Sequence, residues 1–306
     1  MTRLLPFAML VIMGAAWGAT QPLTKIAVSE GYRHFGLIFW QTVLVGLLLG
    51  MLTLLKGKRL PMHPAALRLY LFIAVIGTVA PGIASYQAAV HLPSGVLSIL
   101  LSSVPMFAFP IALALGTDRL VLSRVAGLLS GLGGVALLVL PEASLPAGTD
   151  AIWIAIGLIA PVCYALEGNV VAKWGMQGLD SVQVLTGASV LGAVLSLPLA
   201  LSSGQFIVPS LPLGAPDKAM IAAAVLHGFA YSTFVWLVGR AGAVFAAQVS
   251  YLVTLFGVTW AMLFLSEAYV GWVWAALILM MAGMFLVQPQ RKPLVPEPAP
   301  RQNAVG

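Results

Sequence analysis

The chain has 306 residues, of which 60% are hydrophobic and only 8% are charged, and its mean hydropathy is +1.02. Soluble domains are far more polar, so this composition excludes a soluble globular protein and indicates a membrane protein. The formal net charge of +6 would suggest a nucleic-acid partner in a soluble chain. Here the cations sort by loop, and we expect the lipid bilayer as a partner and no nucleic acid.

Apolar runs of about 20 residues, the length that crosses a bilayer as an α-helix, follow one another along the chain. We expect ten transmembrane helices, at 4–27, 35–55, 69–90, 94–115, 121–140, 151–172, 181–201, 219–239, 243–265 and 269–288. The first run is long and lacks a small-residue cleavage site, so we expect a retained helix and not a signal peptide. The connections leave no room for a separate soluble domain.

The basic residues lie mostly in alternate connections. With the N-terminus inside, the outer side receives only Arg33 and Lys218, with Lys25 near a helix end. The cytoplasmic side collects Arg3, Lys56, Lys58, Arg59, Arg68, Arg119, Arg124, Lys173, Arg240, Arg291, Lys292 and Arg301. Because cytoplasmic loops carry the excess of Lys and Arg, we expect a multi-pass protein with both termini cytoplasmic.

A faint internal repeat organises these spans. Residues 96–138 align without gaps on residues 245–287 at a shift of 149 positions, and each copy has two apolar runs around one acid, Asp118 or Glu267. Five spans in each copy would place the copies in opposite orientations, as in many secondary transporters. We therefore predict an all-α membrane protein of ten transmembrane helices, arranged as two inverted five-helix repeats.

These repeats define the expected domains. The first five-helix repeat occupies 1–145, the second occupies 146–288, and 289–306 is a proline-rich, disordered cytoplasmic tail. On one helix of the first repeat, Gly127, Gly131 and Gly134 form a small-residue face. This face favours close helix packing, either within the fold or across a homodimer.

Polar residues inside apolar spans are the best guide to a transport pathway, because they are costly in hydrocarbon unless they face a cavity or a partner. Glu167 and His227 stand out. Either could relay protons or bind substrate, and either could instead be packed between helices in a neutral or paired form. Tyr231 shares a helical face with His227, and Thr78 and Gly82 are their counterparts in the other repeat.

Further candidates line other spans. Trp17 and Gln21 share a face of the first helix, and Tyr164 lies at a similar depth in the sixth. These aromatic rings could stack on a planar substrate or act as interfacial anchors. Two polar stripes complete the set: Ser98 and Ser102 on the fourth span, and Gln248, Tyr251 and Thr254 on the ninth. Their polar groups could bind a ligand or satisfy neighbouring backbone.

The sequence resembles the drug/metabolite transporter superfamily, in particular its EamA-like ten-helix exporters. The resemblance covers about residues 5–288 and rests on Trp17-Gly18 with Lys25, and on the acid-containing junctions Leu115-Gly116-Thr117-Asp118-Arg119-Leu120 and Leu265-Ser266-Glu267. It implies a cell inner (plasma) membrane exporter of amino acids or other small metabolites. Where the family often has an arginine early in the second helix, this chain reads Phe39-Trp40-Gln41.

The leading hypothesis is a secondary transporter that exports a small metabolite, such as an aromatic or other amino acid, by alternating access, with protons as a candidate coupling ion. The expected substrate-binding residues are Trp17, Gln21, Ser102, Tyr164, Glu167, His227, Tyr231, Gln248 and Tyr251. One cysteine, Cys163, excludes an intramolecular disulfide and a multi-cysteine metal site, and no cofactor is expected. The alternatives are a non-transporting receptor or assembly subunit and an intramembrane enzyme, although HExxH and GxSxG motifs are absent.

Overall fold

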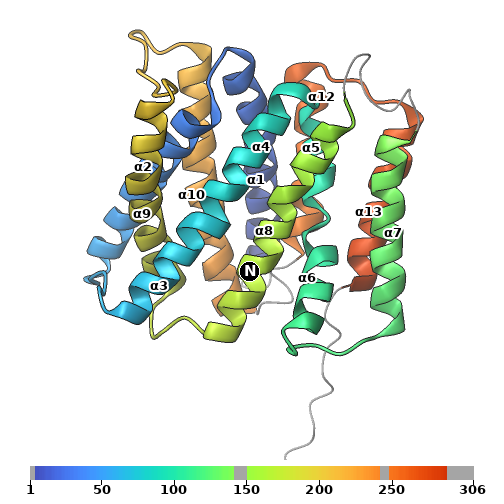
Figure 1. Cartoon of the computed structure of the whole chain (residues 1–306), viewed down its shortest axis with the longest axis horizontal. Helices are drawn as coiled ribbons and strands as arrows, with labels where there is room; N and C mark the ends of the chain where they lie inside the picture. Colours follow the sequence, from blue (N-terminus) through green and yellow to red (C-terminus); the bar gives the residue numbers. More distant parts are fainter. Residues whose placement is uncertain (1–3, 141–149, 242–247, 288–306) are drawn as a thin grey trace, which may run out of the picture.

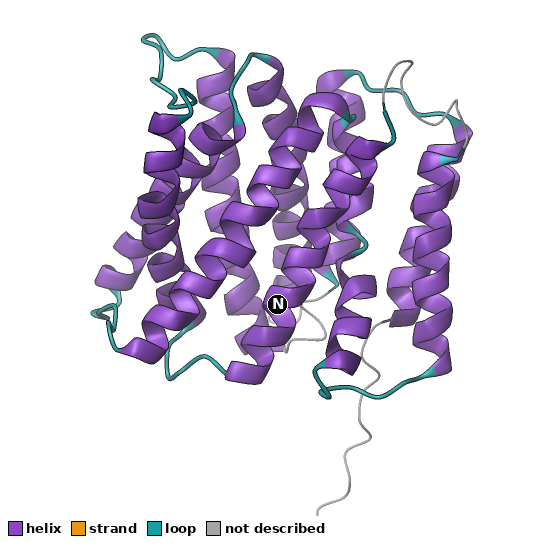
Figure 2. Ribbon diagram, in the orientation of Figure 1, coloured by secondary structure: helices purple, strands orange, loops and turns teal. Residues whose placement is uncertain are grey.

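The computed structural model describes residues 4–140, 150–241 and 248–287, and within these ranges every regular element is helical (Figure 1; Figure 2). The tail expected at 289–306 lies outside the described residues. The elements are α1 (Leu4–Ser29), α2 (His34–Leu55), α3 (Pro64–Phe72), η1 (Ile73–Val79), α4 (Ala80–His91), α5 (Ser94–Leu101), α6 (Val104–Ala114), α7 (Leu122–Val139), α8 (Ile152–Trp174), α9 (Ser181–Ser202), α10 (Ala215–Ala241), α12 (Val249–Leu265) and α13 (Gly271–Val287).

The all-helical, multi-pass class is confirmed. Seven described stretches are long and apolar enough to cross a bilayer: 5–29, 34–55, 64–91, 94–114, 122–139, 152–174 and 181–202. The helices α12 and α13 are apolar but shorter, with 17 residues each, and α10 has 27 residues. The count of ten spans stays a prediction, and the third and fourth expected spans are each built from more than one helical segment.

The third expected span contains a π-helical segment, η1, between α3 and α4. Pro81 has no N–H group and so cannot donate to the carbonyl of Gly77, one turn earlier. The N–H of Ala80 instead bonds the carbonyl of Val75, five residues back. Such wide turns are frequent at functional sites, and this one lies beside the candidate site described below.

The fourth expected span is interrupted between α5 and α6. Pro105 cannot donate to the carbonyl of Leu101. Two buried serines donate side-chain hydrogen bonds to carbonyls in the last turn of α5. The hydroxyl of Ser102 donates to the carbonyl of Ile99 at 2.6 Å, and that of Ser103 donates to the carbonyl of Leu100 at 2.6 Å. The Ser102 hydroxyl therefore satisfies its own helix end, which is the alternative to ligand binding considered for it.

The contact between α7 and α13 follows the repeat. At the shift of 149 positions α7 and α13 begin at equivalent residues, and Ser130 donates to the carbonyl of its own counterpart, Leu279, at 2.8 Å. A Cβ atom added to Gly283 would lie 2.7 Å from the carbonyl oxygen of Gly127 and 3.0 Å from the nitrogen of Gly131. The small-residue face of α7 is thus used within the chain, against α13.

The two copies run in opposite directions through the bundle. In Figure 1 the α6–α7 connection lies at the lower end, whereas the equivalent α12–α13 connection lies at the upper end. We call the lower end, with the α2–α3, α6–α7 and α8–α9 connections, the basic end, because these connections carry Lys56, Lys58, Arg59 and Arg119. The upper end is called the opposite end.

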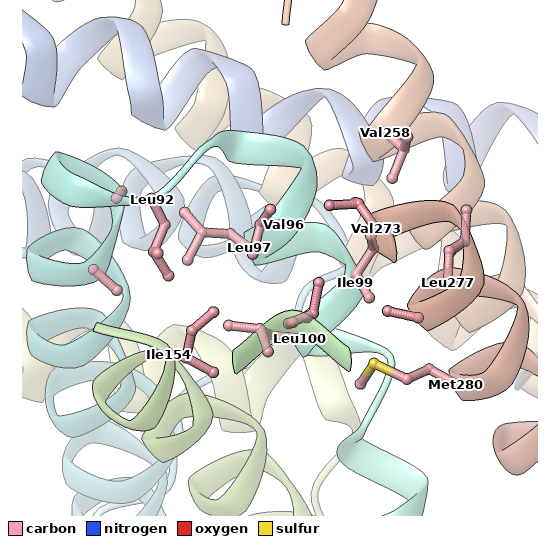
Figure 3. Close-up of a cluster of buried hydrophobic side chains, with 14 of the residues drawn as sticks. Leu92, Val96, Leu97, Ile99, Leu100, Ile154, Val258, Val273, Leu277 and Met280 are labelled. Carbon is pink, nitrogen blue, oxygen red and sulfur yellow. The ribbon is translucent and has the colours of Figure 1, made fainter. Parts of the chain in front are cut away.

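Each repeat inserts its first helix against the other repeat. The helix α1 packs on α10 and α12, and its counterpart α8 packs on α4 and α6. The short helix α5 forms the centre of the largest apolar cluster. Figure 3 shows its side chains Val96, Leu97, Ile99 and Leu100 among Leu92, Ile154, Val258, Val273, Leu277 and Met280 from α8, α12, α13 and the α4–α5 connection. Both repeats therefore share one core.

Hydrogen bonds tie the opposite end together across the repeats. The carboxylate of Glu267 accepts from the nitrogen of Ser94 at 2.8 Å, from its hydroxyl at 3.0 Å and from the nitrogen of Gly95 at 3.2 Å, and the Tyr269 hydroxyl also donates to it. An acid at a helix N-terminus is favourable because the helix dipole is positive there. The expected acid-containing junction of the second repeat thus caps α5 of the first.

At the basic end Asp180 forms the N-cap of α9. Its carboxylate accepts from the nitrogen of Gln183 at 2.8 Å, the Gln183 side chain accepts from the nitrogen of Asp180 at 3.0 Å, and Lys58 donates to the carboxylate at 2.5 Å. Burial tends to raise the pKa of Asp180, but the hydrogen bonds from Lys58 and Gln183 outweigh it, and the pKa is lowered. The cap therefore stabilises above the pKa of the unfolded chain and is lost as the pH falls through the lower, folded pKa.

We expect Asp180→Ala to lower the free energy of unfolding by about 1 kcal/mol, the usual cost of losing an N-cap. Thermal unfolding in detergent at neutral pH measures this change. Lys58→Ala removes only a partly exposed ion pair and should cost less, about 0.5 kcal/mol. Equal losses in the two variants would show that the ion pair, and not the cap, carries the stabilisation.

Candidate functional site

Two of the predicted residues meet where α1 packs on α10. The rings of Trp17 and His227 lie edge to face, with centroids 5.8 Å apart and planes at 83°. Tyr231 follows His227 by one turn of α10, and Phe234 lies near both Trp17, at 6.4 Å, and Tyr231, at 6.5 Å. These contacts place Trp17, His227 and Tyr231 on one aromatic wall of the bundle interior.

Glu167 occupies the equivalent crossing of α8 with the other repeat. Its carboxylate lies against Gly77 of η1, so that a Cβ atom added to Gly77 would be 2.6 Å from the carboxyl carbon. A larger residue at position 77 would force this carboxylate to move. At the shift of 149 positions Thr78 is the counterpart of His227, so Glu167 against η1 mirrors Trp17 against His227 to within about one residue.

Two tyrosines lie between the α1–α10 crossing and the crossing of α8 with η1. The hydroxyls of Tyr164, one turn before Glu167, and of Tyr231, on α10, both lie close enough to the Glu167 carboxylate to interact with it electrostatically. Tyr164 also lies near Tyr86 of α4, whose hydroxyl donates to the side-chain carbonyl of Gln41. The hydroxyls of Tyr86, Tyr164 and Tyr231 and the carboxylate of Glu167 thus lie near one another, between α4, α8 and α10.

Tyr86 and Gln41 were not among the predicted residues. Both lie inside expected spans, at 69–90 and 35–55, and the cost of burying unpartnered polar groups was the signal that could have found them. The remaining predicted residues lie elsewhere. Ser102 is buried at the end of α5, Gln248 is the N-cap of α12, and Tyr251 packs against the largest apolar cluster.

Much of the hydrogen-bonding capacity of this set is not used by the protein. Within the described part of the chain, no hydrogen bond engages the side chains of Trp17, Gln21, Tyr164, Glu167, His227 and Tyr231. These residues are half-buried, yet none of their polar atoms is among the sealed, unsatisfied ones. Unpartnered polar atoms that keep accessible surface inside an apolar bundle can bind a polar solute or a proton.

A separate cavity of about 220 Å³ lies toward the basic end. Its polar lining is Asp118, Arg124, Asn169 and Ser250, and its apolar lining includes Phe109. None of the predicted site residues lines it. A water-sized space of about 10 Å³ lies beside Gln41 and Tyr86. Among the described residues no cluster of His, Cys, Asp and Glu could hold a metal ion.

A protein of known crystal structure has a similar fold, with a TM-score of 0.59 over 92% of this chain and 98% of the other, at 20% sequence identity. At this identity the likeness shows the fold alone. No curated protein sequence matches the chain. The sequence profile of the EamA-like transporter family matches residues 5–140 and 151–288, which are the two repeats. The chain is therefore a multi-pass membrane protein that belongs to the EamA-like transporter family.

Proposed function

We propose that the chain is a secondary transporter that exports a small metabolite, such as an aromatic or other amino acid, across the cell inner (plasma) membrane. The observation that carries this proposal is the set of unpartnered polar groups on α1, α8 and α10, centred on Trp17, Tyr164, Glu167, His227 and Tyr231. Aromatic rings can stack on an apolar or planar substrate, while the acid and hydroxyls bind its polar groups.

Alternating access is supported by the arrangement of the repeats. The equivalent α6–α7 and α12–α13 connections lie at opposite ends of the bundle (Figure 1), as inverted repeats require. The opposite end is tied by Glu267 across the repeats, while a cavity of about 220 Å³ lies toward the basic end. Rocking one repeat against the other would open the opposite end and close the basic end. By the positive-inside rule the basic end faces the cytoplasm, with both termini.

Protons are the proposed coupling ion, with Glu167 and His227 as the residues that would carry them. Each lies where the first helix of one repeat crosses the other repeat, so a change of protonation would act on the contact that must rearrange. A carboxyl group or imidazole inside a membrane protein is costly to keep charged, and such residues mark proton relays in many transporters.

Flux into vesicles reconstituted with the purified full-length protein tests the transport proposal. We expect saturable uptake of labelled phenylalanine or tryptophan, and Tyr231→Ala should raise the half-saturating concentration about tenfold, equivalent to about 1.4 kcal/mol of lost binding. Phe229→Ala is the matched control, since Phe229 lies on the same helix but is exposed on its outer face.

A receptor, an assembly subunit or an intramembrane enzyme predicts no saturable flux for any solute in a screen of amino acids and related metabolites. Equal half-saturating concentrations for Tyr231→Ala and Phe229→Ala would show instead that transport occurs but that the substrate does not contact the aromatic wall on α10.

A further inference from the structure

The cavity at the basic end differs in its lining from the proposed transport site between α1, α8 and α10, which is centred on Trp17, Tyr164, Glu167, His227 and Tyr231 and is called the aromatic set below. It measures about 220 Å³ and lies among α6, α7, α8, α12 and α13. A single water needs about 10–15 Å³ on this scale, so the space fits a small organic solute. Arg124, Asp118 and Asn169 form its polar part, and Phe109, Met284 and Val287 contribute to its apolar wall.

Arg124 is buried in this wall with an unused donor. The residue is 7% exposed, and its Nη1 group donates to the carboxylate of Asp118. The guanidinium carbon lies 5.6 Å from the centre of the Phe109 ring. In the part of the chain that the structure describes, neither Nε nor Nη2 of Arg124 has a hydrogen-bond partner; Nε is sealed from solvent, whereas Nη2 is not. Leaving a donor of a buried charged group unpaired is costly, so the accessible Nη2 points to an acceptor that is not part of the protein.

The repeat shows that packing alone does not require an arginine here. At the shift of 149 positions the counterpart of Arg124 is Val273 on α13, which is 2% exposed and serves as an apolar core residue. The counterpart of Asp118 is Glu267, whose carboxylate is occupied by α5 and Tyr269. The first repeat therefore has a cation where the same fold position elsewhere holds a valine.

The geometry of the guanidinium selects the ligand. Because Nη1 holds Asp118 and Nε is sealed, Nη2 is the donor left for a second acceptor, and a carboxylate oxygen forms a strong, charge-assisted hydrogen bond with it. The Asn169 amide nitrogen donates to the carbonyls of Ala108, at 3.1 Å, and Ala165, at 2.9 Å. Its oxygen remains as an acceptor for an ammonium group.

We propose that this cavity is a second binding site, which takes the carboxylate of a small amphipathic acid, amino acids included, at the basic end of the bundle. Nη2 of Arg124 binds the carboxylate, and the apolar wall takes the hydrocarbon part. In the transport cycle, which rests on the proposed function, the site holds the solute before it reaches the aromatic set. Binding itself requires no transport.

Calorimetry on the full-length protein in lipid nanodiscs tests the site, with 3-phenylpropionate as the probe and 3-phenylpropanamide as its uncharged equivalent. We expect the acid to bind saturably and the amide to bind at least about tenfold more weakly, as for loss of a hydrogen bond to a charged group. Arg124→Gln should weaken the acid to the level of the amide. Arg119→Gln is the matched control: Arg119 is an exposed arginine of the α6–α7 connection, and its replacement should leave the affinity unchanged.

Equal binding of acid and amide by the wild-type protein would overturn the proposal, and this comparison needs no variant. So would equal acid affinities for Arg124→Gln and Arg119→Gln. If Arg124→Gln does not fold, Arg124→Lys keeps the charge but loses the planar guanidinium that places Nη2, and it should still weaken the acid about tenfold. Glu167→Gln should retain acid binding even where flux is lost, so failure of the transport proposal and failure of this site give different results.

Discussion

Replacing Glu167 with glutamine is expected to reduce flux in reconstituted vesicles at least about tenfold and to remove its dependence on pH, because the transported solute loses a hydrogen bond to a charged group, which costs about 1.5–3 kcal/mol. Glutamine has nearly the same size, so the close contact with Gly77 of η1 is kept. What is lost is the exchangeable proton and the negative charge beside Tyr164 and Tyr231. Initial rates between pH 5 and 8, under an imposed proton gradient, measure both effects.

Glu30→Gln is the matched control, since Glu30 is exposed in the α1–α2 connection and the same chemical change there should leave flux intact. His227→Ala should also alter the pH profile, because the imidazole stands against Trp17 at the equivalent crossing. If Glu167→Gln and His227→Ala both retained wild-type flux at every pH, neither residue would carry protons. The proposal that these residues couple transport to protons would then be wrong.

The helical class could be predicted from composition because a bilayer leaves few alternatives: apolar runs of about 20 residues must satisfy their own backbone as helices. The breaks inside the third and fourth spans were less accessible. Pro81 and Pro105 mark them in the sequence, but a proline in a membrane helix can also give a simple kink. That η1 widens into a π-helix, and that Ser102 and Ser103 close the end of α5, depends on tertiary packing.

The site was only partly predictable for a related reason. The cost of polar groups in hydrocarbon singled out Glu167 and His227, and helical periodicity placed Tyr231 beside His227. Neither rule states which helices cross, so the partnership of Glu167 with Gly77 and the participation of Tyr86 could not be predicted. The cavity beside Arg124 was missed because an arginine near a helix end is also expected from the positive-inside rule alone.

Replacing Gly283 with alanine is expected to lower the free energy of unfolding by about 2 kcal/mol and the melting temperature by about 5 °C. The new methyl group would lie 2.7 Å from the carbonyl oxygen of Gly127 and 3.0 Å from the nitrogen of Gly131. Both are backbone atoms of α7, so no side chain can move aside and the two helices must separate. Thermal unfolding of the purified protein in detergent, followed by circular dichroism, measures the change.

Gly168→Ala provides the same substitution without the clash, since a Cβ atom there meets nothing within 4 Å. Because alanine favours a helix interior over glycine by up to about 1 kcal/mol, this variant should melt at or above the wild-type temperature. If Gly283→Ala had the same melting temperature as Gly168→Ala, the close approach of α7 and α13 would be wrong. The contact between the repeats through α7 and α13 would then be wrong.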